Sequence, residues 1–240
     1  DIAMINKKLN TGFTLIELII VVLLGSIILL GILQVFTLNQ NTSLLQKSMI
    51  DTQNSGFFVS TLLTSDLQKT GISDESISKY DVYPFNFDKT SENNDGNSQI
   101  SIAYMNTFND YNCSGQVGLT TIINTYKVKN KTLYCNDLEL MQDVERFKVN
   151  YGIDLDGDNF VDRYVDRNTA LEMTNTNKYK IISVQFALLI SSNKEYEEVS
   201  SKQYQILNNE VLKYNDGKYY RLFTKNVILK NMLWGLYVKK

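Results

Sequence analysis

The longest run of apolar residues lies near the N-terminus of the chain. Residues 13–36 read FTLIELIIVVLLGSIILLGILQVF, and Glu17 is the one charged residue among these 24. About 20 apolar residues let a helix cross the hydrocarbon core of a bilayer. Lys7 and Lys8 precede the run and supply the positive flank that stays in the cytoplasm. A membrane-spanning helix is therefore predicted over 13–36, with the following residues on the other side of the membrane.

Two simple N-terminal segments do not account for this run. A cleaved secretory signal peptide has an apolar region of about 7–15 residues, which is shorter than the run observed. A plain membrane anchor fits the length but leaves Glu17 unexplained, because a carboxylate there costs roughly 2.5–3.5 kcal/mol on insertion. An ionisable residue within a membrane segment therefore indicates a function.

Helical periodicity continues beyond the membrane segment. Apolar residues recur at helical spacing well past residue 36, and Gly71 suits a C-terminal stop. The predicted helix runs from Phe13 to about Thr70 and would be roughly 85 Å long at 1.5 Å per residue. Its second half, 37–71, is amphipathic and should pack on a globular head. The helix is expected to bend most easily at its glycines, which are Gly25, Gly31 and Gly56.

The remaining residues, 72–240, predict a globular α+β head. Ile72–Ser98 is polar, contains the only proline, Pro84, and is expected to be a surface loop. The secondary structure of Tyr196–Tyr214 is ambiguous. The apolar patterns predict strands over Gln99–Met105, Leu119–Val128, Lys131–Cys135, Val144–Tyr151, Tyr179–Ile190 and Lys218–Leu229. Adjacent strands in the head can pair antiparallel, and no second long helix is predicted there. We therefore expect one long helix on an antiparallel β-sheet.

Composition narrows the classes of function. The chain has 24 Lys+Arg, 26 Asp+Glu and no His. Without His, Ser-His-Asp and Cys-His triads and His-containing zinc sites are excluded, so we do not expect an enzyme. Nucleic-acid binding is not favoured, because it relies on phosphate neutralisation and the Lys residues here are scattered rather than grouped.

Two cysteines, Cys113 and Cys135, follow the membrane segment. They would lie on its non-cytoplasmic side, where disulfides form and persist. A structural disulfide between them is favoured over two free thiols. It would contribute roughly 3 kcal/mol in the chain-entropy model.

An acidic segment in the head, 151–165, reads YGIDLDGDNFVDRYV. Its carboxylates fall at the first three ligand spacings and the ninth position of an EF-hand-type calcium loop, and a backbone carbonyl falls at the seventh. The candidate calcium ligands are Asp154, Asp156, Asp158, Phe160 and Asp162.

This segment departs from the calcium loop in two places. Asn159 replaces the glycine of the sharp turn, although Asn tolerates left-handed backbone. Val165 stands where a bidentate Glu is expected, and Asp166 comes one place late. The alternative is a turn built on Asx hydrogen bonds and neutralised by Arg163 and Arg167. Calcium is therefore a candidate ligand, and no cofactor is required.

Residues 12–18, GFTLIEL, resemble the processing site of type IV prepilins. The resemblance implies that a membrane aspartyl peptidase cuts after Gly12 and methylates the new N-terminus, Phe13. The leader would lie within residues 1–12 and reads best as 4–12, with residues 1–3 preceding a plausible start at Met4. In a stack of apolar helices, an unpaired Glu17 is costly, so its pairing with a neighbour's N-terminal ammonium would set axial register.

Three further segments resemble the PilW-type minor pilins. They are the helix ending at Asp66–Gly71, the segment Val144–Val165 and the closing segment Arg221–Asn231. Ile72–Gln142 carries no such resemblance. The implied fold is type IV pilin-like, with 13–36 as the transmembrane and filament-core helix.

The resemblance implies a minor pilin that primes pilus assembly and can sit at the tip. The pilus would serve twitching motility, adhesion or DNA uptake. The expected partners are other minor and major pilins, the prepilin peptidase, the inner-membrane assembly platform and, before assembly, membrane lipid. The expected location is the inner membrane, single-pass with a periplasmic head, and then the cell surface. The alternatives are a J-type minor pseudopilin of a type II secretion system and a membrane-anchored calcium-dependent binding protein.

Overall fold

The computed structural model describes residues 12–71, 85–87, 90–92, 95–106, 110–117, 119–175, 179–195 and 201–233. The chain forms two compact units, Asp1–Gln46 and Lys47–Lys240. The leader up to residue 11 and Pro84, to which the sequence assigned a loop, lie outside the described residues.

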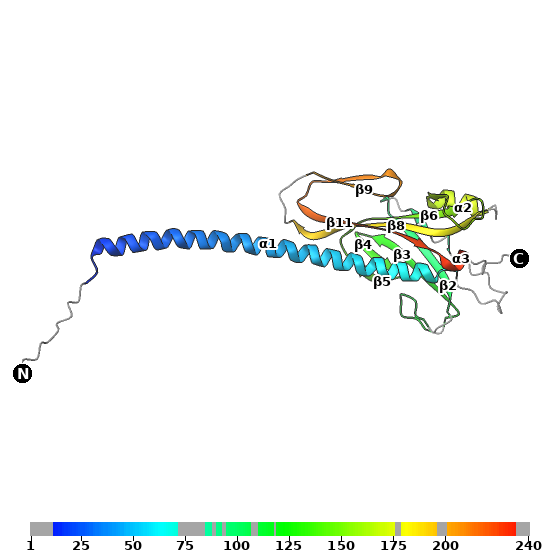
Figure 1. Cartoon of the computed structure of the whole chain (residues 1–240). Helices are drawn as coiled ribbons and strands as arrows, with labels where there is room; N and C mark the ends of the chain where they lie inside the picture. The colour runs from blue at the N-terminus through cyan, green and yellow to red at the C-terminus, as the bar shows by residue number, and fades with distance from the viewer. Residues whose placement is uncertain are drawn as a thin grey trace, which may run out of the picture. The chain divides into compact units, whose positions relative to one another are not determined.

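The predicted long helix is confirmed as α1, Leu15–Lys69 (Figure 1). In the first unit, the large apolar side chains from Phe13 to Phe36 are all more than half exposed. This part of α1 contains one stretch that is long and apolar enough to cross a membrane. In the second unit, α1 is amphipathic as predicted. It buries one face, consisting of Ser48, Thr52, Gly56, Val59, Ser60, Leu63, Asp66 and Leu67.

The C-terminal end of α1 is capped by a distant part of the chain. Gly71 follows the helix with φ +80°, as the predicted stop requires. Helix α3, Lys230–Leu233, lies beside this end, and Asn231 donates from Nδ2 to the carbonyls of Gln68 (3.0 Å) and Thr70 (3.1 Å). A helix end leaves such carbonyls without partners, so Asn231 fixes this end of α1 on the head.

The strands of the head form three sheets, all with antiparallel pairing in the described ladders. The five-stranded sheet has the order β1 (Ser91–Glu92), β2 (Ser98–Met105), β3 (Thr121–Lys129), β4 (Thr132–Cys135), β5 (Leu138–Met141). The four-stranded sheet has the order β11 (Lys218–Ile228), β8 (Lys180–Glu195), β6 (Val144–Asp154), β7 (Arg163–Val165). The two-stranded sheet pairs β10 (Val211–Tyr214) with β9 (Lys202–Gln205).

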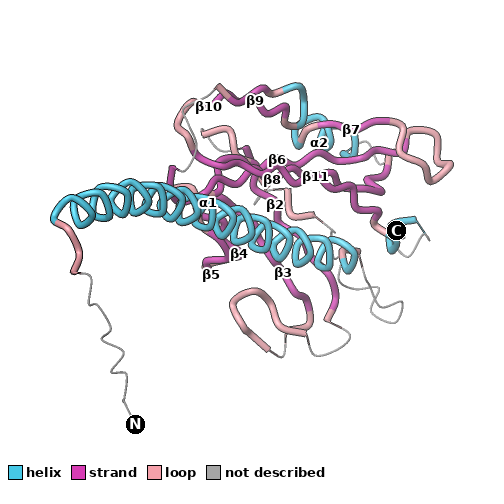
Figure 2. The backbone as a smooth tube through the Cα atoms, turned by 60° about the vertical axis from the view of Figure 1, so that its left-hand side comes forward, coloured by secondary structure: helices cyan, strands magenta, loops and turns pink. Residues whose placement is uncertain are grey.

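All six predicted strands are present with shifted ends, but the expectation of one sheet is wrong. Strand β8 explains why, because its central residues are buried on both faces and need a cover on each. One face packs with α1 through a core that includes Phe186 and Leu188. The other packs with the hairpin of β9 and β10 through Ala187 and Leu189. Figure 2 shows this hairpin on the side of β8 away from α1.

The ambiguous segment Tyr196–Tyr214 contributes this hairpin, with a 3-10 turn at Leu207–Asn209 between its strands. Its first residues, 196–200, lie outside the described residues. Among the described residues, two short α-helices were not predicted: α3, at the end of the head, and α2 (Arg167–Asn175). Asp166 caps α2 by accepting the Thr169 N–H at 2.8 Å, which is an N-cap arrangement.

The expectation of a surface loop over Ile72–Ser98 is wrong for several of its described residues. Phe85 belongs to the core, and Thr90, Asn97 and Ser98 are buried. The Asn97 side chain accepts the Phe147 N–H at 2.8 Å, and the Ser98 hydroxyl accepts the Val149 N–H at 3.1 Å. Polar composition misled the prediction, because these side chains join β2 to β6 rather than face water.

Gly56 was expected to be a weak point of α1, but the structure gives it a packing role. It lies in the buried face of the helix, against β8 and β11. A Cβ at this position would overlap the Phe223 ring and lie 2.6 Å from Ile190 Cδ1. Glycine therefore lets the helix backbone approach the four-stranded sheet.

We predict that Gly56→Ala lowers stability by about 1–3 kcal/mol, because overpacking outweighs the gain in helix propensity. Thermal unfolding of the full chain in detergent measures this. Gly25→Ala is the matched control, since nothing lies within 4 Å of that Cβ position, and it should not lower the midpoint. Phe223→Ala should reduce the penalty of Gly56→Ala, and equal penalties in both backgrounds would contradict this account.

Candidate functional site

The predicted processing site lies at the start of α1. Gly12 and Phe13 are exposed and precede the helix, and Glu17 lies in its first turn. The Thr14 hydroxyl accepts the Glu17 N–H at 3.3 Å, and Glu17 Oε2 accepts the Thr14 N–H at 3.1 Å. This reciprocal pair is a capping box that starts the helix at Leu15.

The capping box gives Glu17 a role in its own subunit that sequence reasoning missed. The available signal was the spacing Thr-x-x-Glu over residues 14–17. In a bilayer, backbone N–H groups have no water to bond, so the capping bonds help to bring this helix start into the membrane. Cleavage after Gly12, methylation of Phe13 and the register role of Glu17 stay predictions.

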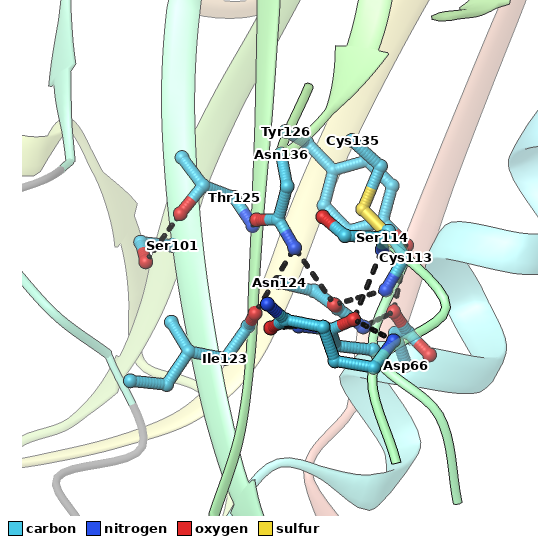
Figure 3. The surroundings of a disulfide bond; sticks show 12 residues. Asp66, Ser101, Cys113, Ser114, Ile123, Asn124, Thr125, Tyr126, Cys135 and Asn136 are labelled. Carbon is cyan, nitrogen blue, oxygen red and sulfur yellow. Dashed lines mark hydrogen bonds between the residues drawn. A yellow bond between two sulfur atoms is a disulfide. The ribbon is translucent and has the colours of Figure 1, made fainter. Parts of the chain in front are cut away.

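The predicted disulfide is present. Cys113 and Cys135 are bonded, with their Cα atoms 5.7 Å apart. Cys135 is fully buried on β4, opposite Tyr126 on β3. Figure 3 shows that Asn124 and Asp66 lie beside this bond.

Asp66 is a buried carboxylate that sequence reasoning treated only as part of a family-like ending. Its Oδ2 accepts hydrogen bonds from Asn124 Nδ2 and from the Tyr126 hydroxyl, both at 2.7 Å (Figure 3). Burial raises the pKa of Asp66, while these two donors and nearby Lys69 oppose the rise. Burial and the Asp66 carboxylate raise the pKa of Tyr126, so its hydroxyl remains a donor.

The acidic loop brings together some of the predicted calcium ligands. One carboxylate oxygen each from Asp154, Asp156 and Asp162 lies within 4.8 Å of the others. Asp154 is buried, and the other two are exposed. Asp158 is outside this group, and its carboxylate accepts the Phe160 N–H at 2.7 Å. Three of the five candidate residues are therefore placed to offer side-chain oxygens to one cation.

The same carboxylates also shape the loop. Asp154 accepts the N–H groups of Gly157 (2.6 Å) and Asn159 (3.1 Å), and Asp162 accepts that of Leu155 (2.6 Å). Asn159 has φ +66°, the left-handed conformation expected of it. The Asx-type bonds of the alternative interpretation are also present, because Asp156 accepts the Asp158 N–H (3.2 Å) and Asp158 accepts the Phe160 N–H (2.7 Å).

The expected neutralisation by Arg163 and Arg167 is wrong. The guanidinium of Arg163 contacts the Met173 sulfur at 3.2 Å. That of Arg167 donates to the carbonyl of Phe87 at 2.5 Å. Among the described residues, no ion pair joins either arginine to the loop aspartates. The arginines instead stabilise packing on α2 and on the segment before β1.

Comparisons with known proteins match two parts of the chain. The family model described as Type IV Pilus-assembly protein W (PilW) matches residues 113–231, and the prokaryotic N-terminal methylation motif matches residues 7–33. Among solved structures, a type IV-like pilin from Thermus thermophilus is similar, with 14% identity and a TM-score of 0.48. The match covers 75% of this chain and 97% of that one. The comparison with curated proteins gives no match.

We predict that calcium raises the melting temperature of the full chain through the three grouped carboxylates. A hundredfold excess over Kd should give a rise of roughly 5–10 °C. Asp156→Asn should reduce the rise, because it removes one of the three negative charges around the cation. The amide oxygen of the variant can still accept the Asp158 N–H, so the loop itself should be preserved. Asp158→Asn, outside the group, is the control and should keep the rise. An unchanged melting temperature in calcium would leave the loop as a hydrogen-bonded turn alone.

Proposed function

We propose that the chain is a PilW-like minor pilin, a sub-stoichiometric subunit that primes pilus assembly. The matches of the PilW family model to residues 113–231 and of the methylation motif to residues 7–33 support this proposal. Family and motif imply contacts with other pilins and with the prepilin peptidase. The observation that carries the proposal is the exposed apolar part of α1 behind the methylation motif.

The exposed part of α1 needs an apolar surrounding. Each large apolar side chain that leaves water stabilises a folded or assembled state by about 1.5–3 kcal/mol. Lipid supplies that surrounding before assembly and neighbouring pilin helices supply it afterwards. We place the protein in the inner membrane as a single-pass subunit with a periplasmic head, and then at the cell surface in the pilus. The assembly platform is its proposed partner in the transition.

Glu17 provides the polar contact in this apolar surrounding. Both hydrogen bonds that the Glu17 carboxylate accepts from Thr14 use Oε2, and Oε1 makes no hydrogen bond within the described part of the chain. The carboxylate can therefore cap its own helix and accept the N-terminal ammonium of a neighbour. That pairing avoids an isolated charge in an apolar stack and fixes the axial register.

The finer roles are also proposals. A subunit that primes assembly enters the pilus first, so a place at the tip and support of motility, adhesion or DNA uptake follow from it. The subunit is proposed to be non-catalytic. A J-type pseudopilin of a type II secretion system would share the same N-terminal chemistry, and the neighbouring genes distinguish the two machines. Calcium binding is a second candidate function, favoured by the three grouped carboxylates.

We predict that Glu17→Ala leaves the protein inserted in the membrane and cleaved but lowers the number of pili. The variant removes the proposed register contact and the carboxylate half of the capping box, and it keeps the apolar helix. Electron microscopy of the native host and immunoblotting of membrane fractions measure the two effects. Asp51→Ala is the matched control, since it removes an exposed carboxylate from the same helix outside the apolar run. Normal piliation with Glu17→Ala would contradict the register argument.

A further inference from the structure

Side-chain hydrogen bonds connect the last turn of α1 to the disulfide. Asn124, buried on β3, donates from Nδ2 to Asp66 Oδ2 at 2.7 Å. Its Oδ1 accepts the backbone N–H of Cys113 at 2.8 Å. One amide side chain therefore bridges the helix and a bonded cysteine (Figure 3).

The bridge has one workable orientation. An ionised carboxylate only accepts hydrogen bonds, so the NH₂ group of Asn124 has to face Asp66. The amide oxygen of Asn124 then faces Cys113 and accepts its backbone N–H. Asn136 Nδ2 also donates to this oxygen, at the longer distance of 3.4 Å. Because the Cys113 N–H is the closer of the two donors, a shift of Cys113 weakens the hold on the Asn124 amide and disturbs its contact with Asp66.

The disulfide determines where Cys113 lies. Cys135 is fully buried in β4, a strand of the five-stranded sheet. Through the bond, segment 110–117 is held against that sheet. The same segment carries Asp110, whose carboxylate forms an ion pair with Lys69 at 2.8 Å. Both contacts reach the final residues of α1, Asp66 and Lys69.

We propose that the Cys113–Cys135 disulfide is a redox-sensitive latch for the last turn of α1, with Asn124 as its positioning residue. In the disulfide form, Asn124 and Asp110 fix this turn on the five-stranded sheet. In the dithiol form, segment 110–117 is released, and the buried Asp66 carboxylate loses a bond that offsets its desolvation. The proposal does not depend on the protein's role in a pilus.

Other contacts limit the release to this turn. Val59 and Leu63 pack in the main core, and Gly56 approaches β8 and β11. Asn231 still caps the carbonyls of Gln68 and Thr70. The dithiol form therefore keeps the helix on the head and loosens its end.

Hydrogen exchange of the full chain in detergent tests the latch. A dithiol reagent supplies two electrons and two protons to give the two cysteine thiols, and it becomes a cyclic disulfide. We expect amides of residues 64–70 to exchange roughly tenfold faster after reduction, the order expected for losing a hydrogen bond to a charged group. Amides of β6 and β8 should keep their rates.

Two variants separate the latch from general loosening. In Asn124→Ala the end of α1 should already exchange fast with the disulfide intact, and reduction should add less than about twofold. Asn150→Ala is the matched control. Asn150 is also buried, but it lies on β6 of the four-stranded sheet and pairs with Asn208 in the turn between β9 and β10. This control variant should show the full response to reduction.

Three results would overturn the proposal. One is unchanged exchange of residues 64–70 on reduction of the wild-type chain. Another is a full tenfold response in Asn124→Ala. The third is faster exchange throughout β6 and β8, which would mean that the disulfide holds the whole head. Wild-type reduction alone decides the first and third, so the test stands even if Asn124→Ala fails to fold.

Discussion

One continuous helix has to satisfy two environments, and the rest of the structure follows from this constraint. The first part of α1 exposes large apolar side chains from Phe13 to Phe36 and needs lipid or other helices around it. From Ser48 onward the helix buries one face in the head. A polar group is tolerated in the first part only where it has a partner, and Thr14 and Glu17 meet that condition by capping each other.

The head is organised to hold the second part of this helix. Contacts reach α1 from separate parts of the sequence: Phe223 at Gly56, Asn124 and Tyr126 at Asp66, Asp110 at Lys69, and Asn231 at the final carbonyls. Several of these groups are polar and buried, so each depends on a specific partner rather than on apolar area alone. A change in the position of the disulfide segment or of the C-terminal segment would therefore alter contacts made by the last turn of α1.

Sequence patterns predicted the elements better than their assembly. The helix, the six strands and the disulfide follow from periodicity, alternation and compartment, which are local properties. The division into separate sheets depends on which faces of β8 are covered, and no local pattern carries that information. Polar residues such as Asn97 and Ser98 were assigned to a surface loop because composition does not reveal a buried hydrogen-bond partner. The acidic spacing located the loop, yet the Asp158 carboxylate accepts the Phe160 N–H and the arginines pack elsewhere.

We propose that α1 becomes a pilin helix after processing between Gly12 and Phe13. The mass of the N-terminal peptide, measured on protein isolated from its native host, tests this most directly. The account predicts a chain that begins with N-methylated Phe13. An intact leader, or cleavage at another bond, would contradict it and would leave an ordinary membrane-anchored protein.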